Sequence, residues 1–118
     1  PAVRCAHRRR RAGLPVAGSE RLAMADASLI GMTVAELAKL IQAKDVSPVA
    51  VAEAFIERTD ATEPQLNAWI TLLPDETRAA AKQAEAEIAA GNYKGPLHGI
   101  PIALKDIYDT AGIRTCLL

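Results

Sequence analysis

Aromatic residues are scarce in this sequence: its 118 residues include one Trp, one Phe and two Tyr, 3% of the chain. Any core must therefore rely on Ala, Val, Leu and Ile. Cys5 and Cys116 lie near opposite ends, and without a Cys-x-x-Cys pair they predict neither a disulfide scaffold nor a zinc site. No apolar run approaches the roughly 18 to 20 residues that span a bilayer. We therefore expect a soluble protein of a reducing compartment, the cytoplasm.

Charge is distributed unevenly, although the formal net charge is zero. Residues 1–23 contain six Arg and one acidic residue, Glu20, whereas residues 24–118 carry a net charge of −5. Met24 opens a stretch that resembles a natural start. We expect residues 1–23 to be a non-native or disordered Arg-rich leader, translated from upstream sequence, and residues 24–118 to be the N-terminal part of a domain. A transit peptide and a nucleic-acid-binding arm are the alternatives for the leader.

Start and stop signals predict two helices in the first half of this domain. Thr33 and Glu36 have the spacing of a capping box, and the helix after Thr33 should extend to about Ala43. Ser47-Pro48 should start the second helix, with Ser as the N-cap and Pro at the first helical position. Thr62-Glu63-Pro64 should end the second helix or shortly follow its end, because proline disfavours a helical conformation in the residue before it.

A third, longer helix is predicted from about Asp75 to Ala90, in a run of strong helix formers that ends at Gly91-Asn92. Glu85, Glu87 and Lys82 should form its solvated face. The residues expected to be buried are Val34, Leu37, Ala38 and Ile41 in the first helix, Val49, Ala52, Phe55, Ile56 and Thr59 in the second, and Ala80, Ala84 and Ile88 in the third.

Two segments have the composition of buried strands instead. Residues 67–73 (NAWITLL) are rich in aromatic and β-branched residues, and both faces of such a strand would be largely apolar. Residues 100–104 (IPIAL) are a short apolar run between turn residues. The order helix, helix, strand, helix, strand predicts the opening of an α/β layered domain. Because two strands cannot cover themselves, we expect the sequence to be the front of a larger protein.

The second predicted strand would end at Lys105-Asp106. An ammonium group that leaves water tends to lose its proton, and a neutral amine is a base, so Lys105 is a candidate general base. Asp106 would favour the charged ammonium, but consecutive strand residues point to opposite faces. The alternative is a lysine at the rim of the fold with its amine in water, as for most lysines.

Residues 95–115, GPLHGIPIALKDIYDTAGIRT, closely resemble the first block of the amidase signature family. That family includes bacterial and eukaryotic amidases and the A subunit of tRNA-dependent amidotransferases. The helix after Thr33, the Ser47-Pro48 pair and the Asn67-Ala-Trp-Ile-Thr stretch are similar to the same enzymes. The resemblance covers roughly residues 28–115. It implies an α/β fold, of which this sequence holds the N-terminal helices and first strands.

The resemblance also implies a chemical role for Lys105. In this family the lysine of the Lys-Asp pair is the base of a Ser–cis-Ser–Lys triad. The neutral lysine takes a proton from a bridging serine, which deprotonates the serine that attacks an amide carbonyl. Water, or ammonia transfer in the amidotransferases, completes the cycle without a metal or organic cofactor. The intact enzyme would bind a small-molecule amide and no membrane, and nucleic acid only if it belongs to an amidotransferase.

The serines depart from the family pattern. Both family serines lie in a Gly/Ser-rich region far downstream of the Lys-Asp pair, whereas Ser19, Ser28 and Ser47 all precede Lys105. After Thr115 the sequence reads Cys-Leu-Leu where the family usually continues with small residues. We therefore expect a truncated fragment of an amidase, inactive alone because only the lysine of the triad is present. A fragment of the A subunit of an amidotransferase and a non-catalytic interaction module are the alternatives.

His98 is the other titratable residue of the block. Taken alone it could act as a general base, but no second His or acid accompanies it at ligand spacing. A structural histidine in a turn is therefore expected. Gly95 and Gly99 beside it should provide permissive turn conformations.

Overall fold

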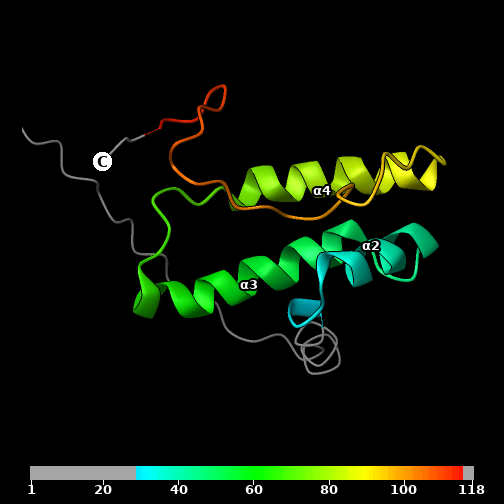
Figure 1. Cartoon of the computed structure of the whole chain (residues 1–118), viewed down its shortest axis with the longest axis horizontal. Helices are drawn as coiled ribbons and strands as arrows, with labels where there is room; N and C mark the ends of the chain where they lie inside the picture. Colours follow the sequence, from blue (N-terminus) through cyan, green and yellow to red (C-terminus); the bar gives the residue numbers. More distant parts are fainter. Residues whose placement is uncertain (1–28, 116–118) are drawn as a thin grey trace, which may run out of the picture.

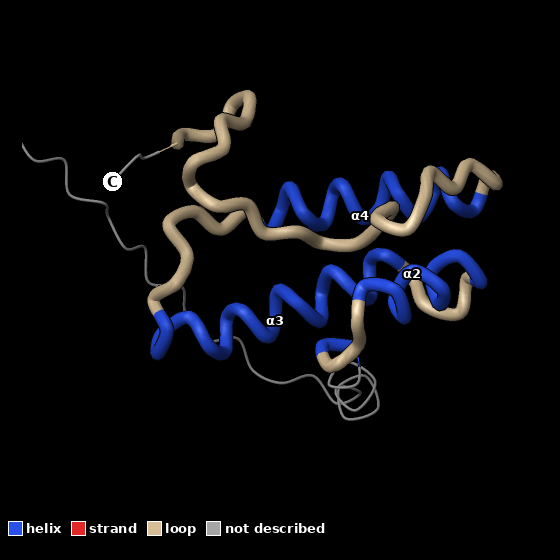
Figure 2. Tube along the Cα trace, in the orientation of Figure 1, coloured by secondary structure: helices blue, strands red, loops and turns tan. Residues whose placement is uncertain are grey.

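A computed structural model describes residues 29–115 of the chain. Three helices are bounded within this range: α2 (Val34–Ala43), α3 (Pro48–Leu66) and α4 (Pro74–Ala89). α3 and α4 lie side by side and antiparallel, and α2 packs near the start of α3 (Figure 1). After α4 the chain turns back and runs beside that helix as irregular structure (Figure 2). The expected leader, residues 1–23, lies outside the described residues.

The predicted start signals of the first two helices are confirmed. Thr33 Oγ1 accepts a hydrogen bond from the Glu36 amide (3.3 Å), and the Glu36 carboxylate accepts one from the Thr33 amide (2.7 Å). This reciprocal capping box satisfies two amides that have no partner inside α2. At α3, Ser47 Oγ accepts from the Val49 amide (3.0 Å), and Pro48 occupies the first turn. Local chemistry therefore sets both helix starts.

The predicted end of the second helix is wrong, because α3 continues through Pro64 to Leu66. Pro64 lacks the amide that would donate to the carbonyl four residues earlier, so α3 loses one hydrogen bond there, and only two helical residues follow it. Asn67 ends the helix in the left-handed conformation (φ 46°), and its amide donates to the Glu63 carbonyl (2.8 Å). The Glu63 carboxylate then accepts from the Ala68 and Trp69 amides (both 3.1 Å). These contacts stabilise the helix end at Leu66, two residues beyond Pro64.

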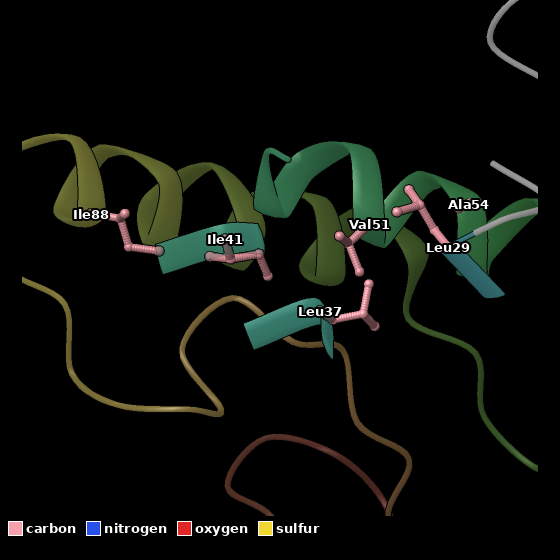
Figure 3. Packing of buried hydrophobic residues seen from close by; sticks show 6 residues of the cluster. All are labelled: Leu29, Leu37, Ile41, Val51, Ala54 and Ile88. Carbon is pink, nitrogen blue, oxygen red and sulfur yellow. The ribbon is translucent and has the colours of Figure 1, made fainter. Parts of the chain in front are cut away.

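The buried core joins all three helices (Figure 3). Leu37 of α2 and Val51 of α3 point toward each other in this view, and Ile88 brings in α4. The predicted burial of Leu37, Ala38, Ile41, Ala52, Ala84 and Ile88 is confirmed.

Other burial predictions are wrong or hold only in part, since Phe55 packs against the core without being fully buried. Val34 is 47% exposed, and Ala81 replaces Ala80 in the interior of α4. In α3 the buried residues include Val51 and Ala54, whereas Val49, Phe55, Ile56 and Thr59 are only partly buried. Apolar residues surround much of the first half of α3, so their spacing alone does not select one face. Packing against α2 and α4 determines which face of α3 is buried.

Neither predicted strand is a strand in this structure. The described residues contain no strand, and their only β-bridge is an isolated one between Thr110 and Ile113. Residues 67–73 and 100–104 are irregular, and Trp69 (41%) and Ile102 (70%) are exposed where a buried strand was expected. A strand is completed by hydrogen bonds to a neighbouring strand, and these two segments form no ladder with each other. The described part of the chain is thus helical, and its helices are too short or too polar to cross a membrane.

Candidate functional site

Lys105 lies on the wall of an open groove with a volume of about 510 Å³. The groove is formed by one side of α3, residues 68–74 and residues 101–115. Lys105 is exposed, so the expectation of a lysine at the end of a buried strand is wrong for this structure. The physical reason is that residues 102–104, which precede Lys105 in the predicted strand, are themselves exposed. The alternative of a rim lysine describes its present surroundings.

Apolar side chains dominate the surroundings of Lys105 in this groove. Trp69, Ile70 and Leu72 approach from the segment between α3 and α4, and Ile102 and Leu104 from the segment that carries the lysine. All five are among the exposed large hydrophobic residues of the described chain. These side chains leave a largely apolar surface in contact with water around Lys105.

The chain beyond Lys105 folds into a short closed loop. The Tyr108 amide donates to the Lys105 carbonyl (3.1 Å), and the Thr115 hydroxyl donates to the Tyr108 carbonyl (3.3 Å). The Thr110–Ile113 bridge closes the tip around Gly112, which adopts φ 78°. These contacts make Lys105 the first residue of a turn, and Asp106 beside it is half-buried.

No serine lines the groove among the described residues. Ser47 is at the start of α3, and its hydroxyl oxygen accepts the Val49 amide as the helix cap. The structure therefore brings together a candidate base and an apolar surface, without a hydroxyl nucleophile of a described serine beside them. The described residues also contain no group of three His, Cys, Asp or Glu side chains that could hold a metal ion.

His98 has an acidic partner that the sequence did not predict. Its Nε2 lies 2.9 Å from Glu87 Oε2, and its Nδ1 accepts a hydrogen bond from the Lys94 amide (3.1 Å). The His98 side chain is only 9% exposed and lies against the Tyr93 ring, with 6.0 Å between ring centroids. Glu87 is eleven residues earlier, in α4, so local spacing could not reveal the pair. The structure shows a largely buried histidine in a turn.

Glu87 is the electrostatic centre of this cluster. Lys94 Nζ lies 2.6 Å from Glu87 Oε2, and Gln83 donates to Oε1 (3.1 Å). These hydrogen bonds, with Lys94 contributing most, lower the pKa of Glu87 from 4.5 to about 2. Glu87 was predicted to be solvated, but its side chain is 24% exposed. It holds Lys94 and His98, two residues of the loop that joins α4 to the Lys105 segment.

Gly99 packs this loop directly onto the helices. Its φ of 85° favours glycine, and a Cβ at this position would lie 2.8 Å from Pro48 Cγ and 2.9 Å from Pro48 Cβ. Pro48 begins α3, and Ala84 of α4 is the next contact at 3.8 Å. The residue after Gly99, Ile100, packs on the core. The chain that leads to Lys105 is therefore anchored where α3 and α4 meet.

A bidentate ion pair holds α3 and α4 together. Arg78 Nε lies 2.7 Å from Glu53 Oε1, and Arg78 Nη2 donates to Glu53 Oε2 (3.0 Å). The Arg78 guanidinium lowers the pKa of Glu53, and Glu53 raises that of Arg78. The planar fork of arginine matches a carboxylate in this geometry, which fixes the relative orientation of the two helices.

Comparison with known proteins identifies the class to which these features belong. The chain belongs to the amidase family, whose family model, Amidase, matches residues 50–117. An amidase of Pseudomonas putida is 44% identical over 88 residues, which cover 75% of this chain and 19% of that protein. The A subunit of the glutamyl-tRNA(Gln) amidotransferase of Geobacter metallireducens is 46% identical over 87 residues, 74% of this chain and 18% of that protein.

The corresponding amidotransferase protein of Alkalilimnicola ehrlichii is 48% identical over 83 residues, 70% of this chain and 17% of that protein. The chain thus spans about a fifth of the length of the curated relatives that it matches. No solved structure matches it.

Proposed function

We propose that this chain is the N-terminal part of an amidase that hydrolyses carboxylic amides, with Lys105 as the base of a Ser–cis-Ser–Lys triad. The observation that carries the proposal is that Lys105 lines an apolar groove and lies within residues 50–117, which the Amidase family model matches. The resemblance of the Lys105-Asp106 pair to the Lys-Asp pair of the family supports this role. Residues 24–118 belong to the domain, and residues 1–23 are a leader outside it.

The proposed reaction needs a neutral amine at Lys105. That amine takes the proton of the bridging serine, whose oxygen takes the proton of the nucleophilic serine as the latter attacks the amide carbonyl. The C–N bond breaks, the leaving amine or ammonia takes the proton back through the same relay, and an acyl-enzyme remains. Water then attacks the ester and releases the acid. A small-molecule amide is the only substrate besides water that this cycle requires, and no cofactor takes part.

The proposed fold of the intact protein is an α/β layered domain. Residues 67–73 and 100–104 become strands when they pair with strands outside residues 29–115, and the groove between them is covered. Their exposed apolar side chains support this proposal, because such surface is costly to leave in water. The 118-residue chain by itself should be inactive, since a base without a nucleophile gives no acyl transfer.

The test is ammonia release from a set of simple aliphatic and aromatic amides by the intact protein. Lys105→Ala should lower kcat/KM by about 10²- to 10⁴-fold, the usual contribution of a positioned general base. Lys82→Ala, an exposed lysine of α4, is the matched control and should keep wild-type turnover. Turnover of an amide by the 118-residue chain, abolished by Lys105→Ala, would show that the inactivity claim is wrong.

The second candidate is the A subunit of a tRNA-dependent amidotransferase. Its support is specific: the two amidotransferase relatives are as similar to this chain (46% and 48% identity) as the amidase is (44%). The same Lys105 chemistry would then release ammonia for transfer to a charged tRNA. Glutamine-dependent transamidation by the intact protein with partner subunits would favour this candidate, and hydrolysis of simple amides without partners would favour the first.

A further inference from the structure

The loop between α4 and Lys105 is held by two hydrogen bonds that meet on the His98 ring. The Lys94 amide can only donate, so His98 Nδ1 must be the acceptor and carry no proton. The proton of the neutral ring is therefore on Nε2, which donates to Glu87 Oε2 at 2.9 Å. One bond closes the turn on itself, and the other ties the turn to α4.

The turn controls where the Lys105 segment leaves the helices. The Ile100 amide donates to the Leu97 carbonyl (3.1 Å), so Ile100 moves with the turn, and the same residue packs on the core. Pro101 follows with a restricted φ, and five residues of extended chain reach at most about 17 Å. A rotation of the turn at His98 would therefore displace Lys105.

We propose that His98 is a positioning residue, whose Nε2–H bond to Glu87 orients the Gly95–Ile100 turn on α4 and thereby sets the position of Lys105. The inference rests on the proposed function for its catalytic consequence only. The contact between Gly99 and Pro48 limits how close the turn can come to α3, and His98 fixes its direction along α4. Lys94 shares Glu87 Oε2 with His98, so the carboxylate is held from two sides.

Two substitutions separate the two bonds of His98. In His98→Gln the side-chain amide can still donate to Glu87 from the position of Nε2. In His98→Asn the shorter side chain can accept the Lys94 amide at the position of Nδ1 but cannot reach Glu87. If the His98–Glu87 hydrogen bond positions Lys105, the His98→Gln protein should behave like wild type and the His98→Asn protein should not. Gln83→Ala, which removes another hydrogen bond to Glu87 without touching the turn, is the matched control.

The first readout uses the 118-residue chain and no activity. Ring ¹⁵N shifts should show the Nε2–H tautomer, and the backbone amide shift of Lys105 should move in His98→Asn but not in His98→Gln or Gln83→Ala. The Nδ1–H tautomer, or an unmoved Lys105 amide in His98→Asn, would overturn the inference. Because this readout needs no turnover, it stands or fails separately from the proposed function.

The second readout is amide hydrolysis by the intact protein. His98→Asn should lower kcat on the order of tenfold with KM unchanged, because a small misplacement of a catalytic group is enough for such a loss. His98→Gln should stay within about twofold of wild type in the same assay. Equal losses in both variants would show a merely structural histidine. Failure of every variant, wild type included, to hydrolyse amides would contradict the proposed function and leave the first readout to decide the inference.

Discussion

The position of the chain segment that leads to Lys105 depends more on single side-chain contacts than on the apolar faces of the helices. Gly99 and His98 are adjacent, and each makes one contact that its neighbours in sequence could not make. The sequence identified both as turn residues from their Gly-rich surroundings. It could not identify Pro48 and Glu87 as their partners, because those residues lie 51 and 11 positions earlier and meet the turn only after α3 and α4 pack.

Gly99→Ala should destabilise the fold more than Gly91→Ala. Both glycines have nearly the same left-handed φ (85° and 87°), so each substitution should cost about 1–2 kcal/mol of backbone strain. Only a Cβ at Gly99 would also contact Pro48, which should add about 1–3 kcal/mol of overpacking. The urea midpoint, followed by circular dichroism, measures the difference. Equal midpoints for the two variants would refute the close approach of Gly99 to α3.

Acid should weaken the Glu87 cluster in a defined pH range. The folded pKa of Glu87 is about 2, below its ordinary 4.5, so the ionised form stabilises the fold. This contribution is fully present above about pH 4.5 and is lost as pH falls toward 2. In Glu87→Gln, the midpoint of urea unfolding should depend less on pH across this range. Glu85→Gln on the exposed side of α4 is the control and should keep the wild-type dependence; a wild-type dependence in Glu87→Gln would contradict the account.

At the scale of elements, sequence patterns predicted the helix starts, which depend on local contacts. They failed for the strands, which depend on contacts between distant segments. The helix starts at Thr33 and Ser47 follow from side chains that cap amides two or three residues away. The two predicted strands failed because a strand depends on a partner, and residues 67–73 and 100–104 do not pair in the described chain. The two segments still differ from the helices, because both are irregular in structure and rich in apolar residues.

Removing the N-cap of α2 should loosen the helix that supplies Leu37 and Ile41 to the core. Thr33→Ala removes the hydroxyl that accepts the Glu36 amide and should cost about 1 kcal/mol. Thr62→Ala is the matched control, because the Thr62 hydroxyl donates back to the Arg58 carbonyl inside α3 and caps nothing. Urea unfolding of both variants checks the prediction. A loss in Thr62→Ala equal to that in Thr33→Ala would show that capping is not the cause.

At the scale of the whole molecule, the described residues form a helical layer with one uncovered apolar side. Trp69, Ile102 and Leu104 line that side around Lys105, and the chain spans about a fifth of the length of its relatives. In the proposed α/β fold, residues 67–73 and 100–104 would pair with strands of the intact protein, and the apolar side chains on this side would leave water.

The single tryptophan of the sequence reports on this covering layer. Trp69 is 41% exposed here, so acrylamide should quench its fluorescence efficiently in the 118-residue chain. In the intact protein the same residue should lie in a strand covered on both sides, with emission shifted to shorter wavelength and weaker quenching. The urea-unfolded chain gives the fully exposed reference. Equal quenching in the 118-residue chain and the intact protein would contradict the proposed sheet.

The central claim, that Lys105 is the base, is tested most directly by amine rescue of Lys105→Ala in the intact protein. If the residue only supplies a proton acceptor, small primary amines should restore part of the lost amide hydrolysis, and more basic amines should restore more at equal concentrations of the free base. The account predicts a loss of about 10²- to 10⁴-fold without amine and a concentration-dependent recovery with it. Wild-type kcat/KM in Lys105→Ala without any added amine would contradict it.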